Sequence, residues 1–250
     1  MSINDVNYTI AVKDVINGII GKQEDIKYLE IGVDEGETFD HIRSSAKHGV
    51  DPYGGSPSIT HKMTSQMFFA MNQYFYKNTY DVIFIDGCHM AEVIQQEVMQ
   101  SLRILNPGGV ILLHDTVPNR KVCQLILEED YEPFLRNLPK ETSDVNSFRE
   151  YINKHGWKGA NGDSWKAVHF LSKMKGIVQL EIMSILQACC TIITCDQDLR
   201  TGTFSAPYFI DNDQLTWEFL EKNYQEILNP KLFEEVVALL NDRILKSKGS

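Results

Sequence analysis

Residues 27–38 read KYLEIGVDEGET, and this stretch decides the fold. Its first part, Lys27 to Ile31, is a short, mainly apolar run that ends at Gly32, which is typical of a buried strand entering a loop. Three similar runs follow in the first half of the chain: 49–51, 82–85 and 110–113. Because each run is short and bounded by turn residues, we interpret all four as strands of one sheet.

A helical segment separates the last two of these strands. Between residues 91 and 105, apolar side chains recur every three or four positions and form one stripe. Pro107-Gly108-Gly109 is expected to end this helix. Strands that alternate with helices indicate parallel strands joined by crossover helices. The sequence therefore predicts an α/β fold with a doubly wound, mainly parallel sheet covered on both faces.

The second half of the chain has a looser pattern. Residues 121–155 and 163–175 look helical, whereas Val178–Met183 and Cys189–Cys195 look like two strands of an antiparallel hairpin at the C-terminal edge of the sheet. Neither strand has enough apolar residues for a core of its own, so we expect a single domain over residues 1–250. Its expected parts are an N-terminal helical segment (1–26), a ligand-binding core (27–118), insertions and edge strands (119–215) and C-terminal helices (216–250).

The composition limits the partners. The chain has 250 residues, and 34 acidic against 24 basic residues give a net charge of -10. No basic cluster offsets this charge, so we expect no nucleic acid and no membrane as partner, and a homo-oligomer stays open. Five cysteines without a CxxC pair indicate neither a disulfide framework nor a structural zinc site. This cysteine pattern fits the reducing cytoplasm, and because no apolar run is long enough to span a bilayer, we expect a soluble protein.

Acidic side chains crowd the loop after the first strand: Asp34, Glu35, Glu37 and Asp40. Ligands of an open parallel sheet bind beyond the carboxyl ends of its strands, and Gly32 and Gly36 would let a ligand approach the backbone. The loop lacks the GxGxxG fingerprint, and its charge repels a pyrophosphate, so NAD and ATP fit poorly. The sulfonium and ammonium groups of S-adenosylmethionine (SAM) fit better. Alternatively, the acids only complement a helix dipole.

Asp51 closes the second strand, 21 residues after Glu30. An acid at this place accepts hydrogen bonds from ribose hydroxyls in nucleoside-binding α/β folds. As a lone residue before Pro52, Asp51 is equally well explained as a turn former.

Two carboxylates and two imidazoles follow the third and fourth strands: Asp86, His89, His114 and Asp115. Carboxylates at the ends of neighbouring strands can hold Mg²⁺ or a similar cation, and a histidine there can take a proton from a hydroxyl. In the alternative interpretation, the histidines are structural residues that fix loops. Cys88 is interpreted as a packing residue, because no second cysteine supports redox or metal chemistry.

Together these strand ends resemble class I SAM-dependent methyltransferases, in particular the group related to macrocin and other sugar O-methyltransferases and to cephalosporin-hydroxylase-like proteins. The resemblance covers residues 27–118, and five ordered motifs carry it: 28–38, 49–52, 63–69, 84–89 and 105–116. It extends more weakly to Asn161-Gly-Asp-Ser-Trp-Lys166. It implies a Rossmann-like fold with SAM as cofactor.

The resemblance also implies roles for single residues. Glu30, Gly32 and Gly36 would line the methionine part of SAM, with Thr38 in the same cofactor site. Asp51 would bind the ribose hydroxyls, and Thr64 and Ser65 would lie near the adenine. Asp86 would serve the cofactor site, catalysis and, with Asp115, a divalent metal. His114 stands where many relatives have a second acid. Either the cation is therefore softer than Mg²⁺, or the site has fewer protein ligands, or His114 acts as the base, a role for which His89 is the other candidate.

The sequence thus predicts a SAM-dependent O-methyltransferase for a hydroxyl of a sugar, glycan or sugar-containing small molecule. Alternatives are a phenolic acceptor, which the aromatic stretch 68–80 would accommodate, and a non-catalytic protein of a glycan pathway that binds SAM or a nucleotide-sugar. We also expect residues 161–166 to fold over the acceptor, with Asp163 or Trp165 touching it, unless Trp165 is a core residue.

Overall fold

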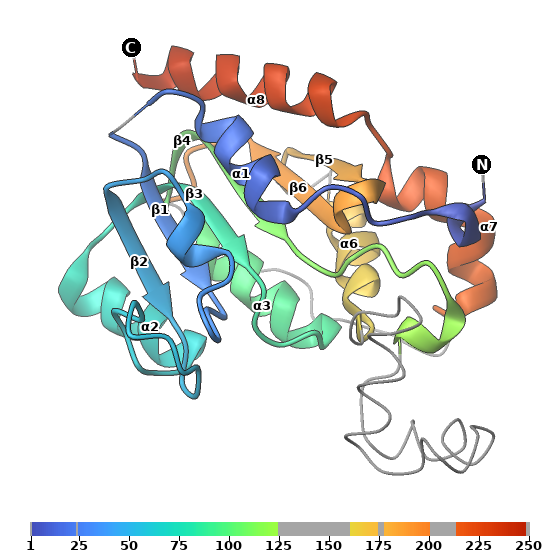
Figure 1. The fold of residues 1–250 in the computed structure, drawn as a ribbon, viewed down its shortest axis with the longest axis horizontal. Helices are drawn as coiled ribbons and strands as arrows, with labels where there is room; N and C mark the ends of the chain where they lie inside the picture. Colours follow the sequence, from blue (N-terminus) through green and yellow to red (C-terminus); the bar gives the residue numbers. More distant parts are fainter. Residues whose placement is uncertain (1, 24, 125–160, 175–177, 201–213, 249–250) are drawn as a thin grey trace.

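The computed structural model describes residues 2–23, 25–124, 161–174, 178–200 and 214–248 (Figure 1). The strands are β1 (Lys27–Ile31), β2 (Ala46–Val50), β3 (Tyr80–Ile85), β4 (Leu105–Leu113), β5 (Leu180–Ile185) and β6 (Cys190–Cys195). The helices of the described residues are α1 (Val12–Ile20), α2 (Ser65–Met71), α3 (Ala91–Leu102), α6 (Ser164–Lys173), α7 (Trp217–Leu228) and α8 (Phe233–Lys248).

The strands form one sheet in the order β2-β1-β3-β4-β6-β5. β1 pairs in parallel with both β2 and β3, and β3 pairs in parallel with β4. β6 runs antiparallel to its two neighbours, β4 and β5, and is therefore the reversed strand of the described sheet. This arrangement confirms the predicted α/β class and the antiparallel hairpin at one edge.

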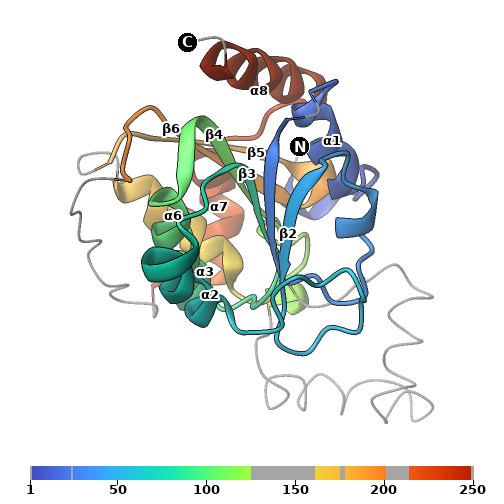
Figure 2. The ribbon, with the colours of Figure 1, turned by 90° about the vertical axis from the view of Figure 1, so that its left-hand side faces the viewer.

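Helices cover both faces of the sheet. α2, α3, α6 and α7 lie on one face, and α1 and α8 lie on the other (Figure 2). Side chains alternate along each central strand, so Ile83 and Ile85 enter the core under the first set of helices, whereas Val82 and Phe84 enter the core under α1 and α8. The expected covering of both faces is confirmed.

Several predicted boundaries need correction. β2 ends at Val50, so Asp51 follows the strand directly instead of closing it. α3 ends at Leu102, and Leu105 already pairs with Tyr80, so the Pro-Gly-Gly run at 107–109 lies inside β4 and does not end the helix. The chain turns earlier because the amide of Tyr80 binds the carbonyl oxygen of Ile104. The helices predicted over residues 216–250 need no such correction: they are α7 and α8, separated at 229–232.

The structure describes only some of the other predicted helical segments. Residues 163–175 contain α6, as predicted, and the N-terminal segment contains α1. Residues 121–124 form a short 3-10 turn, and the rest of the predicted helical stretch up to residue 155 lies outside the described residues. Among the described helices, none combines the length and apolar character needed to cross a membrane.

Candidate active site

The strand order reverses between β1 and β3, because the chain runs from β1 outward to β2 and then returns to the other side of β1. Such a switch point is where open α/β sheets bind their ligands. Gly32, directly after β1, has a φ of 88°, and a side-chain carbon there would overlap the carbonyl oxygen of Asp86 after β3. Only glycine therefore lets the two strand ends approach each other.

A cavity of about 890 Å³ opens at this switch point. Its lining includes seven acidic residues: Glu30, Asp34, Glu35, Glu37, Asp51, Asp86 and Asp115. Lys13 is the single lysine or arginine among the described lining residues. The wall therefore favours cationic and neutral groups over phosphates.

Glu30 reaches this cavity from the end of β1 although it is almost fully buried, at 1% exposure. Tyr28 lies two residues earlier on the same face of the strand, and its hydroxyl donates a hydrogen bond of 2.5 Å to Oε2 of Glu30. Burial raises the pKa of Glu30 to about 8, although the Tyr28 hydrogen bond acts in the opposite direction. A nearby cation would favour the ionised form of this carboxyl group.

Asp51 holds its own loop together. Its Oδ2 accepts a hydrogen bond from the amide of Asp34 at 2.9 Å, and its Oδ1 accepts from the amides of Tyr53 and Gly54. These backbone hydrogen bonds lower the pKa of Asp51 against the opposing effect of burial. The structure thus shows the turn-forming role, while the lining position of Asp51 leaves ribose binding as a prediction.

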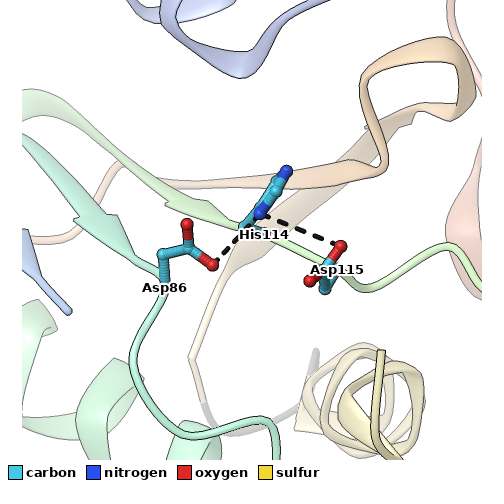
Figure 3. A group of neighbouring side chains, drawn as sticks. All are labelled: Asp86, His114 and Asp115. Atoms are coloured by element: carbon cyan, nitrogen blue, oxygen red, sulfur yellow. Dashed lines mark hydrogen bonds and ion pairs between the residues drawn. The ribbon is translucent and has the colours of Figure 1, made fainter. Parts of the chain in front are cut away.

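Asp86, His114 and Asp115 form the chemical centre of the cavity (Figure 3). Nδ1 of His114 lies 3.0 Å from Oδ1 of Asp86 and 3.8 Å from Oδ1 of Asp115. Each residue offers one ligand atom, and these three atoms lie within 4.8 Å of one another. The predicted convergence of the two strand ends is therefore present in the structure.

The charges in this cluster stabilise one another. Burial lowers the pKa of His114, but attraction to Asp86 and Asp115 outweighs it and raises that pKa to about 9. Burial raises the pKa of Asp86, yet attraction to His114 and the hydrogen bonds from His114 and His89 bring it below the usual value. The pKa of Asp115 is above its usual value because burial outweighs the attraction to His114. At neutral pH the chain therefore pairs an Asp86 carboxylate with a His114 imidazolium.

His89 completes the rim from the loop between β3 and α3. Its Nε2 lies 3.5 Å from Oδ1 of Asp86, and its Nδ1 lies 3.7 Å from Oδ2 of Asp115. The imidazole thus stands between the two aspartates, and it faces the cavity with 27% of its side chain exposed.

A model of a known protein family matches the part of the chain that carries this site. Residues 29–116, which run from β1 through the end of β4 and include Asp86, His114 and Asp115, match the family model described as a methyltransferase domain. This match covers less than half of the chain and shows that residues 29–116 are similar to a methyltransferase domain. No curated protein matches the sequence.

Solved methyltransferases show a distant likeness to the chain. An O-methyltransferase of Bacillus cereus, solved with S-adenosylhomocysteine (SAH), is 13% identical over 74% of this chain and 81% of that one, with a TM-score of 0.42. TomG of Streptomyces achromogenes, solved with SAM, is 9% identical over 76% and 82%, with a TM-score of 0.40. MycE, solved with Mg and SAH, is 12% identical over 77% of this chain and 50% of that one, with a TM-score of 0.36. Because these TM-scores are below 0.5, the methyltransferase assignment rests on the strand order and the family match.

The predicted cofactor residues of the methyltransferase domain divide into two sets. Glu30, Gly32, Thr38, Asp51 and Asp86 line the cavity. Gly36, Thr64 and Ser65 are not among the lining residues. Gly36 has a φ of 85° and packs against Asp40 and Ser56. The hydroxyl of Thr64 caps α2 by accepting a hydrogen bond from the amide of Met67, so its role near an adenine stays a prediction.

Two expectations about the acceptor side need correction. Trp165 has no exposed surface and belongs to the core under α3, α6 and α7, and Asp163 is 5% exposed, so neither lines the cavity. The aromatic stretch 68–80 does not line the cavity either. Phe68, Phe69 and Tyr80 are buried in the core, whereas Tyr74 and Phe75 lie exposed on the outer surface.

The sequence did not predict one wall of the methyltransferase cavity. Residues 8–13, ahead of β1, form this wall, and Ala188 and Cys189 lie beside it. The Tyr8 hydroxyl donates to the carbonyl oxygen of Val117 at 2.5 Å, and the amides of Thr9 and Ile10 both donate to the carbonyl oxygen of Gln187. These contacts join distant segments, and residues 8–13 carry no motif that could have predicted them.

Proposed function

We propose that the protein is an O-methyltransferase that transfers the methyl group of SAM to a hydroxyl of a sugar or a sugar-containing small molecule, assisted by a divalent cation. The observation that carries this proposal is the position of Asp86, His114 and Asp115 in the same cavity as the acidic loop after β1. The acidic loop suits a sulfonium cofactor, and the cluster suits an activated hydroxyl.

The acidic wall supports SAM as the ligand. The sulfonium and ammonium groups of SAM are cations, and Glu30 and Asp86 both face the cavity beside Gly32. Because Glu30 is buried, its ionised form gains most from a cation in direct contact. SAM binding should therefore favour the carboxylate of Glu30.

The donor set supports a divalent cation. Asp86 and Asp115 supply hard oxygen ligands, and His114 supplies an imidazole nitrogen, a ligand that suits Mn²⁺ and other first-row ions better than Mg²⁺. The three residues would hold such a cation, and further positions would stay open for acceptor oxygens. When bound, a cation at this place acts as a Lewis acid that lowers the pKa of an acceptor hydroxyl.

His89 is proposed as the residue that removes the hydroxyl proton. His114 is not suited to this role, because its raised pKa keeps it protonated at neutral pH unless it ligates a cation. His89 lies between Asp86 and Asp115 at the cavity rim, within reach of a hydroxyl bound at the cluster. In the reaction the methyl carbon leaves sulfur and binds the acceptor oxygen, SAH is released, and the hydroxyl proton passes to His89.

The charge of the cavity lining also limits which acceptor can bind. Seven acidic side chains and one lysine among the described lining residues disfavour a nucleotide-sugar, because its phosphates would be repelled. The phenolic alternative loses its basis, since the aromatic stretch 68–80 lies in the core and on the outer surface. A neutral or amino-bearing saccharide hydroxyl is therefore the proposed acceptor.

Transfer of a labelled methyl group tests this proposal. The purified chain is incubated with methyl-labelled SAM and one of three acceptor classes: neutral and amino glycosides, catechols, and nucleotide-sugars. We expect label in the glycosides, loss of transfer after chelation with EDTA, and recovery with Mn²⁺. Transfer to catechols alone would contradict the acceptor class, and full transfer after rigorous chelation would contradict the role of the cation.

A further inference from the structure

A turn outside the cavity contacts the backbone and side chain of Asp115. Asn161 donates from Nδ2 to Oδ1 of Asp115 at 3.1 Å and to the Cys189 sulfur at 3.1 Å. Ser164 donates from its hydroxyl to the carbonyl oxygen of Asp115 at 2.5 Å. Both donors are buried, with exposures of 3% and 0%, and neither lines the cavity.

The same turn contacts the loop that carries His89. Oδ1 of Asp163 accepts a hydrogen bond from the amide of Ala91 at 2.7 Å, at the first residue of α3. Gly162 has a φ of 57°, and a side-chain carbon there would overlap the carbonyl oxygen of His89. Residues 161–164 therefore connect the end of β4 to the loop after β3, and they do so from outside the cavity lining.

Asp115 needs such support. Its φ of 53° is in the left-handed region, which costs a residue with a side chain on the order of 1 kcal/mol or more. Its carboxylate also faces the like charge of Asp86 across His114. The hydrogen bond from Asn161 to Oδ1 opposes rotation of the Asp115 side chain away from Asp86.

We propose that Asn161 is a positioning residue that holds the Asp115 carboxylate in the orientation required for cation binding. This inference rests on the proposed cation site of Asp86, His114 and Asp115. Groups that orient a metal ligand typically change metal affinity by ~10–100-fold when they are removed. Asn161→Ala should therefore weaken cation binding by about that factor. The affinity for SAM should not change, because the Asn161 side chain bonds Asp115 and Cys189 and none of Glu30, Gly32 and Asp51.

A matched control is present at the other end of the sheet. Asn106 donates from Nδ2 to Oδ1 of Asp81 at 2.8 Å, so it forms the same kind of bond as Asn161 does with Asp115. Asp81 lies at the start of β3, and neither residue lines the cavity. Asn106→Ala therefore removes an equivalent bond without reaching the proposed site.

The experiment measures Mn²⁺ affinity by electron paramagnetic resonance, SAH affinity by calorimetry, and the melting temperature, on the full chain and its variants. Asn161→Ala is expected to weaken Mn²⁺ binding ~10–100-fold with SAH affinity within about threefold, and Asn106→Ala is expected to change neither. If Asn161→Ala does not fold, Ser164→Ala replaces it in the test. This variant removes only the hydroxyl that binds the Asp115 carbonyl oxygen, and it should also weaken Mn²⁺ binding.

Three results would overturn the inference. If the variants bind Mn²⁺ as tightly as the wild type does, the positioning role is wrong and the cation site stands. If Mn²⁺ and SAH affinities fall together, Asn161 only supports the fold. If the wild-type chain binds no Mn²⁺, both the inference and the proposed cation site fail.

Discussion

Nδ1 of His114 lies 3.0 Å from Oδ1 of Asp86, across two neighbouring parallel strands. The register explains this contact: Ile85 of β3 pairs with Leu113 of β4, so the next residues along the two strands are Asp86 and His114. The side chains that the sequence places directly after each strand are therefore held at contact distance by the sheet itself.

Asp86→Asn should remove the cation site. The amide is a weaker ligand and no longer balances the charge of His114, so we expect loss of Mn²⁺ binding and a fall in turnover of ~10²-fold or more. Mn²⁺ titration and methyl-transfer assays measure both effects, with the exposed Asp242→Asn as control. A variant that kept its Mn²⁺ affinity would show that Asp86 is not a ligand.

His89→Gln should separate proton removal from cation binding. The glutamine side chain cannot take the proton, so we expect kcat to fall by ~10²–10⁴-fold while the Mn²⁺ affinity is unchanged. His169→Gln, in α6 and outside the cavity lining, is the control. If His89→Gln instead weakens Mn²⁺ binding as strongly as Asp86→Asn does, His89 is a ligand and the base must be assigned elsewhere.

Gly32→Ala should damage both the fold and the cavity. The added carbon overlaps the carbonyl oxygen of Asp86, and the φ of 88° disfavours alanine. We expect a loss of stability of ~2 kcal/mol or more, together with loss of SAH binding. Gly87→Ala is the matched control, because the nearest atoms to its added carbon lie at 3.7 Å. Denaturant unfolding distinguishes them, and equal stability of the two variants would contradict the close approach of β1 and β3.

Glu97→Gln should stabilise the chain at alkaline pH. Burial raises the pKa of Glu97 from 4.5 to about 7, and Oε2 has no hydrogen-bond partner among the described residues. The folded state therefore binds more protons than the unfolded state between these values, and the stability falls as the pH rises through this window. Glutamine removes this loss, so we expect a gain of ~1–3 kcal/mol at pH 8 and much less at pH 5. Glu181→Gln, on the exposed side of β5, should show no such difference; a gain independent of pH would refute the shifted pKa.

Trp165→Ala tests whether this residue is structural. Trp165 is fully buried, so truncation should cost ~3–5 kcal/mol of stability, while the folded fraction keeps its SAH affinity and its KM for the acceptor. Unfolding curves and kinetics at low temperature measure these quantities. A raised acceptor KM without a loss of stability would restore the acceptor contact expected from the sequence.

Local sequence signals predicted the central sheet and the cluster after β3 and β4. Alternating and apolar runs specify strands, and the parallel order then brings Asp86 and His114 to one edge. The sequence could not distinguish the two roles of Asp51, because backbone amides and ribose hydroxyls both call for a carboxylate. The strand at Leu105 was missed, since its apolar side chain continues the stripe of α3 and only the pairing with Tyr80 ends the helix.

Long-range contacts account for the remaining differences. Tyr8 lines the cavity because its hydroxyl binds Val117, 109 residues further along the chain, and Asn161 reaches Asp115 across 46 residues. Neither pairing leaves a periodic pattern in a single sequence. Turn-forming residues before Trp165 favour an acceptor contact for Asp163 or Trp165, with core packing of Trp165 as the alternative, and in α6 the Trp165 side chain faces the core.

Calorimetric titration of the full chain with SAH, and separately with NAD, tests the central claim most directly. The acidic loop after β1 and the glycine contact between β1 and β3 predict saturable binding of one SAH per chain and no measurable binding of NAD. At ~100 times its Kd, SAH should also stabilise the fold by about 2.7 kcal/mol. Saturable NAD binding with no heat from SAH would contradict the assignment of this cavity to SAM.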